Sequence, residues 1–393
     1  MRRLLRIWLL LSLLGGGLLL SAGWALTRPP QPARLRATLS VAEELRGDSA
    51  EGYARATEPR PFTFPADHGP HPEFRTEWWY YTGNLETPDG RHFGFELTFF
   101  RIALAPDLPP RQSSWATNQM YMAHFAVTDV AGSRFHAFER FSRGALGLAG
   151  AQAQPFRVWL EDWSVEAQED DVLPMRLRAA QGDVAIDLSL DSTAPPVLHG
   201  NDGLSQKGPE LGNASYYYSF TRMSATGTVR IGEQRFAVQG LAWMDREWST
   251  SALGPDQAGW DWFALQFADG QDLMFYRLRK QDGSTDPFSA GTLVRGDGSL
   301  RRLSSADVEI EPLGYWQSPR SGARYPVRWR LHVPSEGLEV EITPYLPDQE
   351  LDLTVRYWEG AVRVQGRSND GRPVSGSGYV ELTGYGDTAL RGT

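Results

Sequence analysis

The feature that most constrains the fold is an alternation of apolar and polar residues in short segments from Phe62 onward. In 92–101, for example, every second residue from Phe93 to Phe99 is apolar. Successive side chains of a strand point to opposite faces, so a period of two is typical of half-buried strands. Gly, Pro, Asp and Asn separate the segments. Many short strands joined by turns predict an all-β protein, either a sandwich or a barrel.

Two hairpins with the same turn predict that the β-domain is duplicated. Asp89–Gly90 and Asp269–Gly270 each separate two strand-like segments, and Asp-Gly in that position is a strong hairpin signal. Tryptophans beside a carboxylate precede both hairpins, at 77–80 and at 260–263. The two turns lie 180 residues apart (269 − 89), about the length of one lipocalin-sized barrel. We therefore predict two tandem antiparallel β-barrels.

The first 26 residues have the pattern of a secretory signal. Arg2, Arg3 and Arg6 precede an apolar run, and small residues near position 25 offer a cleavage point. The rival interpretation is an uncleaved anchor, because 7–26 is almost long enough to span a membrane. Both interpretations place the rest of the chain in the periplasm or otherwise outside the cytoplasm. We favour cleavage, and expect membrane contact only through this segment.

The whole chain divides into four predicted parts. Its 393 residues exceed one ordinary domain and suggest two. The signal segment is followed by a proline-rich leader, within which a short helix is expected from Thr38 to Leu45. The predicted parts are 1–26 for the signal, 27–58 for the leader, 59–245 for the first barrel and 246–393 for the second.

Composition excludes several functional classes. The formal net charge of −9 argues against a nucleic-acid partner, which would need a basic face. The chain has no Cys, so disulfides, thiolate metal sites and cysteine nucleophiles are ruled out. It also lacks a Gly-x-Ser-x-Gly elbow, a phosphate-binding glycine loop and a dinucleotide fingerprint. Asp67, His68 and His71 have no recognised metal-ligand spacing. We expect neither a cofactor nor a metal.

Carboxylates stand beside aromatic rings in several motifs, and 14 tryptophans favour a site for an apolar ligand, although an aromatic-rich β-core would explain them equally. In 243–249, Asp245 and Glu247 flank Arg246. Two interpretations stay open: a buried ion pair that staples the domain junction, or a carboxylic acid whose pKa is raised by apolar walls and which donates a proton. The predicted catalytic groups are Asp245, Glu247, Asp261 and Glu77. The predicted ligand-binding residues are Trp78, Trp79, His124, Tyr218, Trp243, Trp248, Trp262 and Tyr276.

Taken together, the motifs at 64–80, 208–218, 243–248 and 259–262 resemble those of the AttH-like, lipocalin-like family that includes the carotenoid 1,2-hydratases (hydroxyneurosporene synthases). The resemblance runs from about Phe62 to Tyr385. It implies two packed lipocalin-like barrels with a cavity for a long apolar molecule. It also implies an association with components of lipoprotein-release-type ABC transporters.

In the hydratases that the chain resembles, water is added across an isoprenoid double bond without a cofactor, and Asp245 matches their aspartate. Those enzymes tend to carry histidine where this chain has Arg246. A fixed cation beside Asp245 is expected to lower its pKa and weaken it as an acid. We therefore predict an exported protein that binds a lipid or isoprenoid-like molecule and serves an ABC transporter. The alternative is a cofactor-independent hydratase or isomerase that acts on an apolar polyene by acid catalysis.

Overall fold

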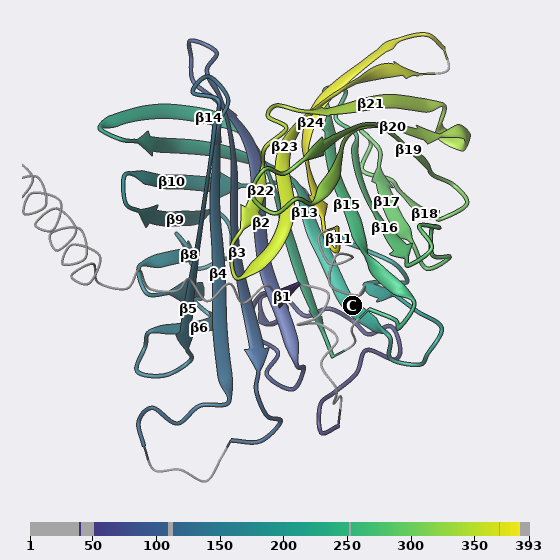
Figure 1. Ribbon diagram of the computed structural model, residues 1–393. Coiled ribbons are helices and arrows are strands. Elements are labelled where there is room, and N and C mark those ends of the chain that lie inside the picture. The colour runs from purple at the N-terminus through teal and green to yellow at the C-terminus, as the bar shows by residue number, and fades with distance from the viewer. Residues whose placement is uncertain (1–38, 41–50, 109–112, 251–252, 369, 386–393) are drawn as a thin grey trace, which may run out of the picture. The chain divides into compact units, whose positions relative to one another are not determined.

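The computed structural model shows an all-β chain, as the alternation predicts (Figure 1). Its strands form two curled antiparallel sheets, one per predicted barrel. Among the residues that the structure describes, no helix is long and apolar enough to cross a membrane. The predicted signal at 1–26 and nearly all of 27–50 lie outside the described residues. The structure describes residues 39–40, 51–108, 113–250, 253–368 and 370–385.

The first sheet has thirteen strands, and its first long strand pairs with the strand that ends the domain. Two short strands, β11 (Val197–Leu198) and β12 (Leu204–Gln206), pair with β13. The main path runs β5 (Arg134–Arg143), β4 (Gln119–Asp129), β3 (His92–Ala103), β2 (Thr76–Glu86), β14 (Gln234–Ser249), β13 (Ala214–Ile231), β10 (Val184–Asp191), β9 (Met175–Gln181), β8 (Trp163–Ala167), β7 (Phe156–Leu160) and β6 (Ala149–Ala153).

The second sheet has eleven strands. Here β1 (Leu39–Ser40) and β22 (Glu350–Asp352) pair with β23 beside the main path. Two short 3₁₀ helices, Ala66–His68 and Pro334–Glu336, complete the elements. The main path runs β18 (Leu300–Ser304), β17 (Ala290–Val294), β16 (Asp272–Lys280), β15 (Gln257–Phe267), β24 (Pro373–Leu382), β23 (Val355–Ser368), β21 (Leu338–Pro344), β20 (Arg324–Val333) and β19 (Glu309–Gln317).

The two sheets repeat one strand order. In each, a hairpin (β2–β3 or β15–β16) leads into further strands, and the last strand, β14 or β24, returns to pair with the first. Both predicted Asp-Gly turns are present. Gly90 and Gly270 have φ angles of 85° and 91°, a left-handed conformation that glycine adopts without strain. The amide of each glycine donates to the carbonyl three residues before it. The structure thus supports duplication.

One domain boundary and one secondary-structure element differ from those expected. The predicted boundary between the two barrels, at 245/246, falls within β14. The chain passes from the first sheet to the second between Ser249 and Gln257. Leu39 and Ser40 belong to the stretch expected to be helical, but they pair with β23 as a strand. The remainder of that stretch lies outside the described residues.

Alternating side chains of the long strands serve two different interiors. On β14, Met244 and Trp248 belong to the core of the first barrel, whereas Trp243 packs in a cluster shared by both sheets. A separate core fills the second barrel around Trp329 and Trp358. The period of two therefore gives β14 one face toward its own barrel and one face toward the second sheet. This second face carries the candidate site.

Candidate active site

A cavity of about 290 Å³ lies between the two sheets. Its wall is largely apolar and is built from strands of both halves of the chain. A few polar side chains interrupt this wall, as is typical of sites for small apolar molecules. The apolar lining residues include Trp78, Phe100 and Met122 from the first sheet and Trp260, Trp262 and Leu278 from the second.

Asp245 lies on this wall, is only 4% exposed, and accepts hydrogen bonds from three side chains. Tyr217 donates its hydroxyl to Oδ2 at 2.6 Å. The indole of Trp243 donates to Oδ1 at 2.6 Å, and Ser219 donates to the same oxygen. Burial raises the pKa of Asp245 to about 7, although these hydrogen bonds favour the ionised form and oppose the shift. Near neutral pH the group can therefore both hold and release a proton.

Glu247 follows two residues later on the same face of β14 and also borders the cavity. Its Oε1 lies 3.5 Å from the ammonium of Lys207 and accepts a hydrogen bond from Ser215. The ammonium nitrogen of Lys207 lies 3.7 Å from the centroid of the Tyr276 ring, and Tyr276 also lines the cavity. Burial disfavours the charge of Lys207, but Glu247 and Tyr276 outweigh it and raise the pKa of Lys207. The cavity thus has an ion pair beside the protonatable Asp245.

Arg246 lies on the opposite face of β14, so the expectation that it lowers the pKa of Asp245 is wrong. Its guanidinium enters the first barrel, where it pairs with Glu77 and donates to the carbonyl of Gly69 at 2.5 Å. It also lies over the ring of Trp79, 4.0 Å from the centroid. This ion pair joins β14 to β2 and to a loop of the same barrel. It does not staple the two barrels together.

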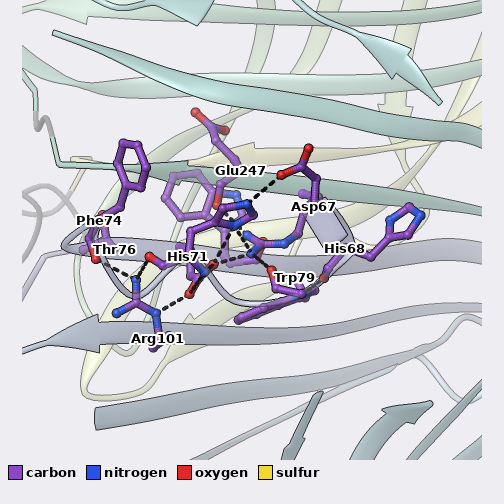
Figure 2. A network of polar contacts seen from close by, with 12 residues as sticks. Asp67, His68, His71, Phe74, Thr76, Trp79, Arg101 and Glu247 are labelled. Carbon is purple, nitrogen blue, oxygen red and sulfur yellow. Dashed lines mark hydrogen bonds and ion pairs between the residues drawn. The ribbon is translucent and has the colours of Figure 1, made fainter. Parts of the chain in front are cut away.

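Figure 2 shows the buried network to which this ion pair belongs, with Arg101 at the lower left and His71 and Asp67 above it. Arg101 pairs with Glu77 and donates to the carbonyl of Phe74 at 2.7 Å. His71 Nε2 lies 3.0 Å from Oδ1 of Asp67. Asp67 and His71 are therefore engaged with protein partners that anchor the loop before β2. Their role in this network is structural.

Two of the predicted catalytic carboxylates are held in such ion pairs. Glu77 borders the cavity. Burial would raise its pKa, but Arg246 and Arg101 hold the pKa of Glu77 well below its usual range. Asp261 is fully buried between Arg277 and Arg279, with N–O distances of 2.5 and 2.9 Å, and is not among the residues that line the cavity. Neither carboxylate is placed to donate a proton to a bound molecule.

The predicted aromatic ligand-binding residues divide according to the face of the strand. Trp78, Trp262 and Tyr276 line the cavity, and Trp243 reaches it through its hydrogen bond to Asp245. The other side chains turn into the first barrel or lie behind the wall, because neighbours along a strand point in opposite directions. Trp79 donates to the carbonyl of His68, Tyr218 contacts Nδ1 of His68, and Trp248 stacks on His71.

His124 lies behind the wall. Its Nδ1 lies 2.6 Å from the hydroxyl of Tyr357, a lining residue of the second sheet. Burial lowers the pKa of His124 to about 3, so the ring is neutral under ordinary conditions. It supports the wall by joining the two sheets, and it does not line the cavity itself.

The structure adds site residues that the sequence analysis missed. Glu359 and Glu381 from the second sheet line the cavity, as do Lys207, Tyr80 and Tyr217. One signal was available, because 357–359 reads Tyr-Trp-Glu, the same combination of carboxylate and tryptophan used to find the other motifs. Glu381 stands between apolar residues of an otherwise ordinary strand and gave no such signal.

Two curled sheets around an apolar cavity with buried carboxyl groups define a lipocalin-like protein of two barrels. A family model described as AttH-like matches residues 55–385, and the chain belongs to this family. A structure from Nitrosomonas europaea assigned to AttH is 37% identical, with a TM-score of 0.75, and the match covers 84% of this chain and 99% of that one.

Kievitone hydratase is a second relative. The sequence from Fusarium solani subsp. phaseoli is 25% identical over 222 residues, which are 54% of this chain and 61% of that enzyme. The match therefore spans about three fifths of the curated relative. The structure of kievitone hydratase from Nectria haematococca has a TM-score of 0.63 at 16% identity and covers 84% of this chain and 97% of that one. At that identity it shows the shared fold alone.

Proposed function

We propose that the protein is a cofactor-independent hydro-lyase that adds water to a carbon–carbon double bond of an apolar substrate. The relation to kievitone hydratase supports a hydratase better than it supports a protein that only binds an apolar molecule. The observation that carries the proposal is Asp245, a buried carboxyl on an apolar wall whose pKa lies near 7. General acids work best when their pKa is close to the operating pH. Export and an association with an ABC transporter stay predictions.

The proposed reaction needs a proton donor and an acceptor. Asp245 transfers its proton to one alkene carbon, which leaves a carbocation at the other. Water forms the new C–O bond at that carbon and passes a proton to Glu247. The ion pair with Lys207 identifies Glu247, and not Asp245, as the ionised carboxylate that accepts this proton. At a rise of about 3.3 Å per residue, residues two apart on a strand lie roughly 7 Å apart, which leaves room for water and the alkene. Return of the proton to Asp245 completes the cycle.

Aromatic faces are suited to the cationic intermediate. Trp78 and Trp262 line the cavity beside this carboxyl pair. A cation over an indole is stabilised by roughly 0.5–2 kcal/mol, with the larger value in a dry site. The indole of Trp262 is held by a 3.1 Å hydrogen bond to the hydroxyl of Tyr217, which itself donates to Asp245. One chain of contacts therefore orients both the acid and an aromatic face.

The experiment is a hydration assay in ¹⁸O-labelled water, with kievitone and neurosporene as probes and mass spectrometry as the readout. Asp245→Asn should lower the rate of alcohol formation by about 10²–10⁴-fold. Asp272→Asn is the matched control, because burial also raises the pKa of Asp272, to about 6, yet the residue does not line the cavity. This control should retain turnover. Equal turnover by wild type and Asp245→Asn would refute the proposed role of Asp245.

A further inference from the structure

The wall contributed by the second sheet carries a pair of carboxyl groups that the proposed reaction does not use. Glu359 on β23 and Glu381 on β24 are direct partners in the register of these strands, and both line the cavity. Directly opposite residues on one sheet face have Cβ atoms about 5 Å apart, so two ionised groups there would repel. Glu359 is only 1% exposed.

This pair differs from the other buried carboxylates in its partners. Glu77 and Asp261 are each held by two arginines, whereas the ion pairs found in the described part of the chain include neither Glu359 nor Glu381. Tyr80, reaching across from the first sheet, donates its hydroxyl to Oε1 of Glu359. The other oxygen, Oε2, is buried and has no hydrogen-bond partner among the described residues. A buried polar atom without a partner is costly, and a hydrogen-bonding group on a bound molecule would satisfy it.

The surroundings favour the protonated form of the pair. The titratable groups that face it are Tyr80 from β2, Glu96 from β3, Tyr357 and Tyr379 from its own sheet, and Asp245 and Glu247 across the cavity. Burial raises the pKa of Glu381 to about 8 and the pKa of Glu359 well above its usual range. Neutral carboxyl groups both donate and accept hydrogen bonds, as hydroxyl and carbonyl oxygens require.

We propose that Glu359 and Glu381 form a recognition site for a hydroxyl or carbonyl oxygen of the molecule in the cavity. The ligand class is therefore an oxygenated apolar molecule, such as a phenol or ketone with an alkenyl chain, and not a pure hydrocarbon. A hydrocarbon would cover the free oxygen of Glu359 and give it no partner. The inference rests on the proposed function only in taking this molecule to be the substrate. Binding alone can test it.

The test compares 4-prenylphenol with prenylbenzene, which differ by one hydroxyl. Both are titrated into the protein, with tryptophan fluorescence and calorimetry as readouts of Kd. Wild type should bind the phenol roughly tenfold more tightly or better, because one hydrogen bond in a dry site has that effect. Equal Kd values for the two probes in wild type would overturn the proposal.

Variants locate the preference. Glu359→Leu should bring the ratio of Kd values close to one, whereas Glu359→Gln, which still donates and accepts, should retain it. Glu339→Leu is the control, because the Glu339 side chain is 60% exposed on β21, and it should behave like wild type. Retention of the preference by Glu359→Leu would refute the assignment of this site.

A third probe separates oxygen recognition from cation binding. A prenylated benzylamine carries an ammonium, which would bind by expelling a proton from the carboxyl pair. Binding tighter than that of the phenol, with proton release in buffers of different ionisation enthalpy, would overturn the assignment to oxygen. Because no arm of the test needs turnover, absence of hydration would count against the proposed function and leave the binding result intact.

Discussion

Asp245 and Arg246 are adjacent in sequence, yet their side chains lie on opposite faces of β14 and belong to different interiors. Arg246 enters the first barrel and pairs with Glu77, while Asp245 faces the second sheet with no ion pair among the described residues. The peptide backbone between them separates a permanently charged network from a carboxyl group that titrates near neutrality. This separation allows one short motif to serve both the stability of the barrel and the proposed chemistry of the cavity.

Loss of the charge at Glu77 should destabilise the fold severely. Glu77→Gln leaves two buried arginines without their carboxylate, and breaking such a network typically costs about 3–5 kcal/mol. Arg176→Met removes a pair whose side chains are 44% and 41% exposed, and should change stability by no more than about 1 kcal/mol. Urea unfolding of both variants measures the difference. A similar small loss in both would contradict the structural role of the network.

Stability should fall as pH rises through the titration of Asp245. Its pKa is about 7 in the folded protein against 3.8 as the ordinary value, so the folded state binds more protons between these values. The contribution is fully present below about pH 4 and is lost as pH rises through about 7. Relative to Asp245→Asn, wild type should lose on the order of a few kcal/mol across this window. Urea titrations at several pH values provide the check, and a flat difference would contradict it.

Removal of one hydrogen bond should move the alkaline limb of the pH–rate profile. In the proposed reaction, turnover requires protonated Asp245, so the rate should decline above about pH 7. The hydroxyl of Tyr217 favours the ionised form, and its loss in Tyr217→Phe should shift the limb upward by about one pH unit. Tyr218→Phe is the adjacent control, because that hydroxyl contacts His68 inside the barrel. A limb that stays in place in Tyr217→Phe would show that another group controls it.

Loss of the indole at position 262 should slow the reaction more than it weakens the fold. Trp262→Phe keeps an aromatic face of lower electron density and removes the donor to Tyr217. A loss of about 1–2 kcal/mol of cation stabilisation corresponds to a rate decrease of roughly 5- to 30-fold. Trp159→Phe, whose indole donates to the carbonyl of Gly147 away from the cavity, should not alter the rate. Rates are compared by the labelled-water assay, and equal rates for both variants would exclude the cationic role.

Local pattern predicted the elements and the duplication. The alternation at 92–101 corresponds to β3, and both Asp-Gly turns lie where their strand pattern requires. The same period of two, applied to 243–248, would have placed Arg246 on the opposite face from Asp245. In the same way it would have placed Trp248 on the face of Arg246 and, applied to 76–86, Trp79 on the face opposite Trp78. These errors came from reading neighbours in sequence as neighbours in space.

The second wall could not be derived in the same way. Glu359 and Glu381 meet through the register of β23 with β24, and Glu359 meets Tyr80, which is 279 positions away in the sequence. No local periodicity specifies which two sheet faces oppose each other. Carboxylates in strands are also ordinary on a solvated face, so their burial becomes visible only after the sheets are placed.

The shared strand order of the two barrels has a consequence for how a molecule can enter the cavity. The last strand of each copy faces the same space, with Asp245 on β14 and Glu381 on β24. Two identical copies would have presented matching walls, and a ligand could then have bound in either orientation. In the proposed reaction and anchor, sequence divergence has made one wall reactive and the other a hydrogen-bonding site. Duplication followed by divergence would therefore give the cavity two different ends, so that its substrate binds productively in one orientation only.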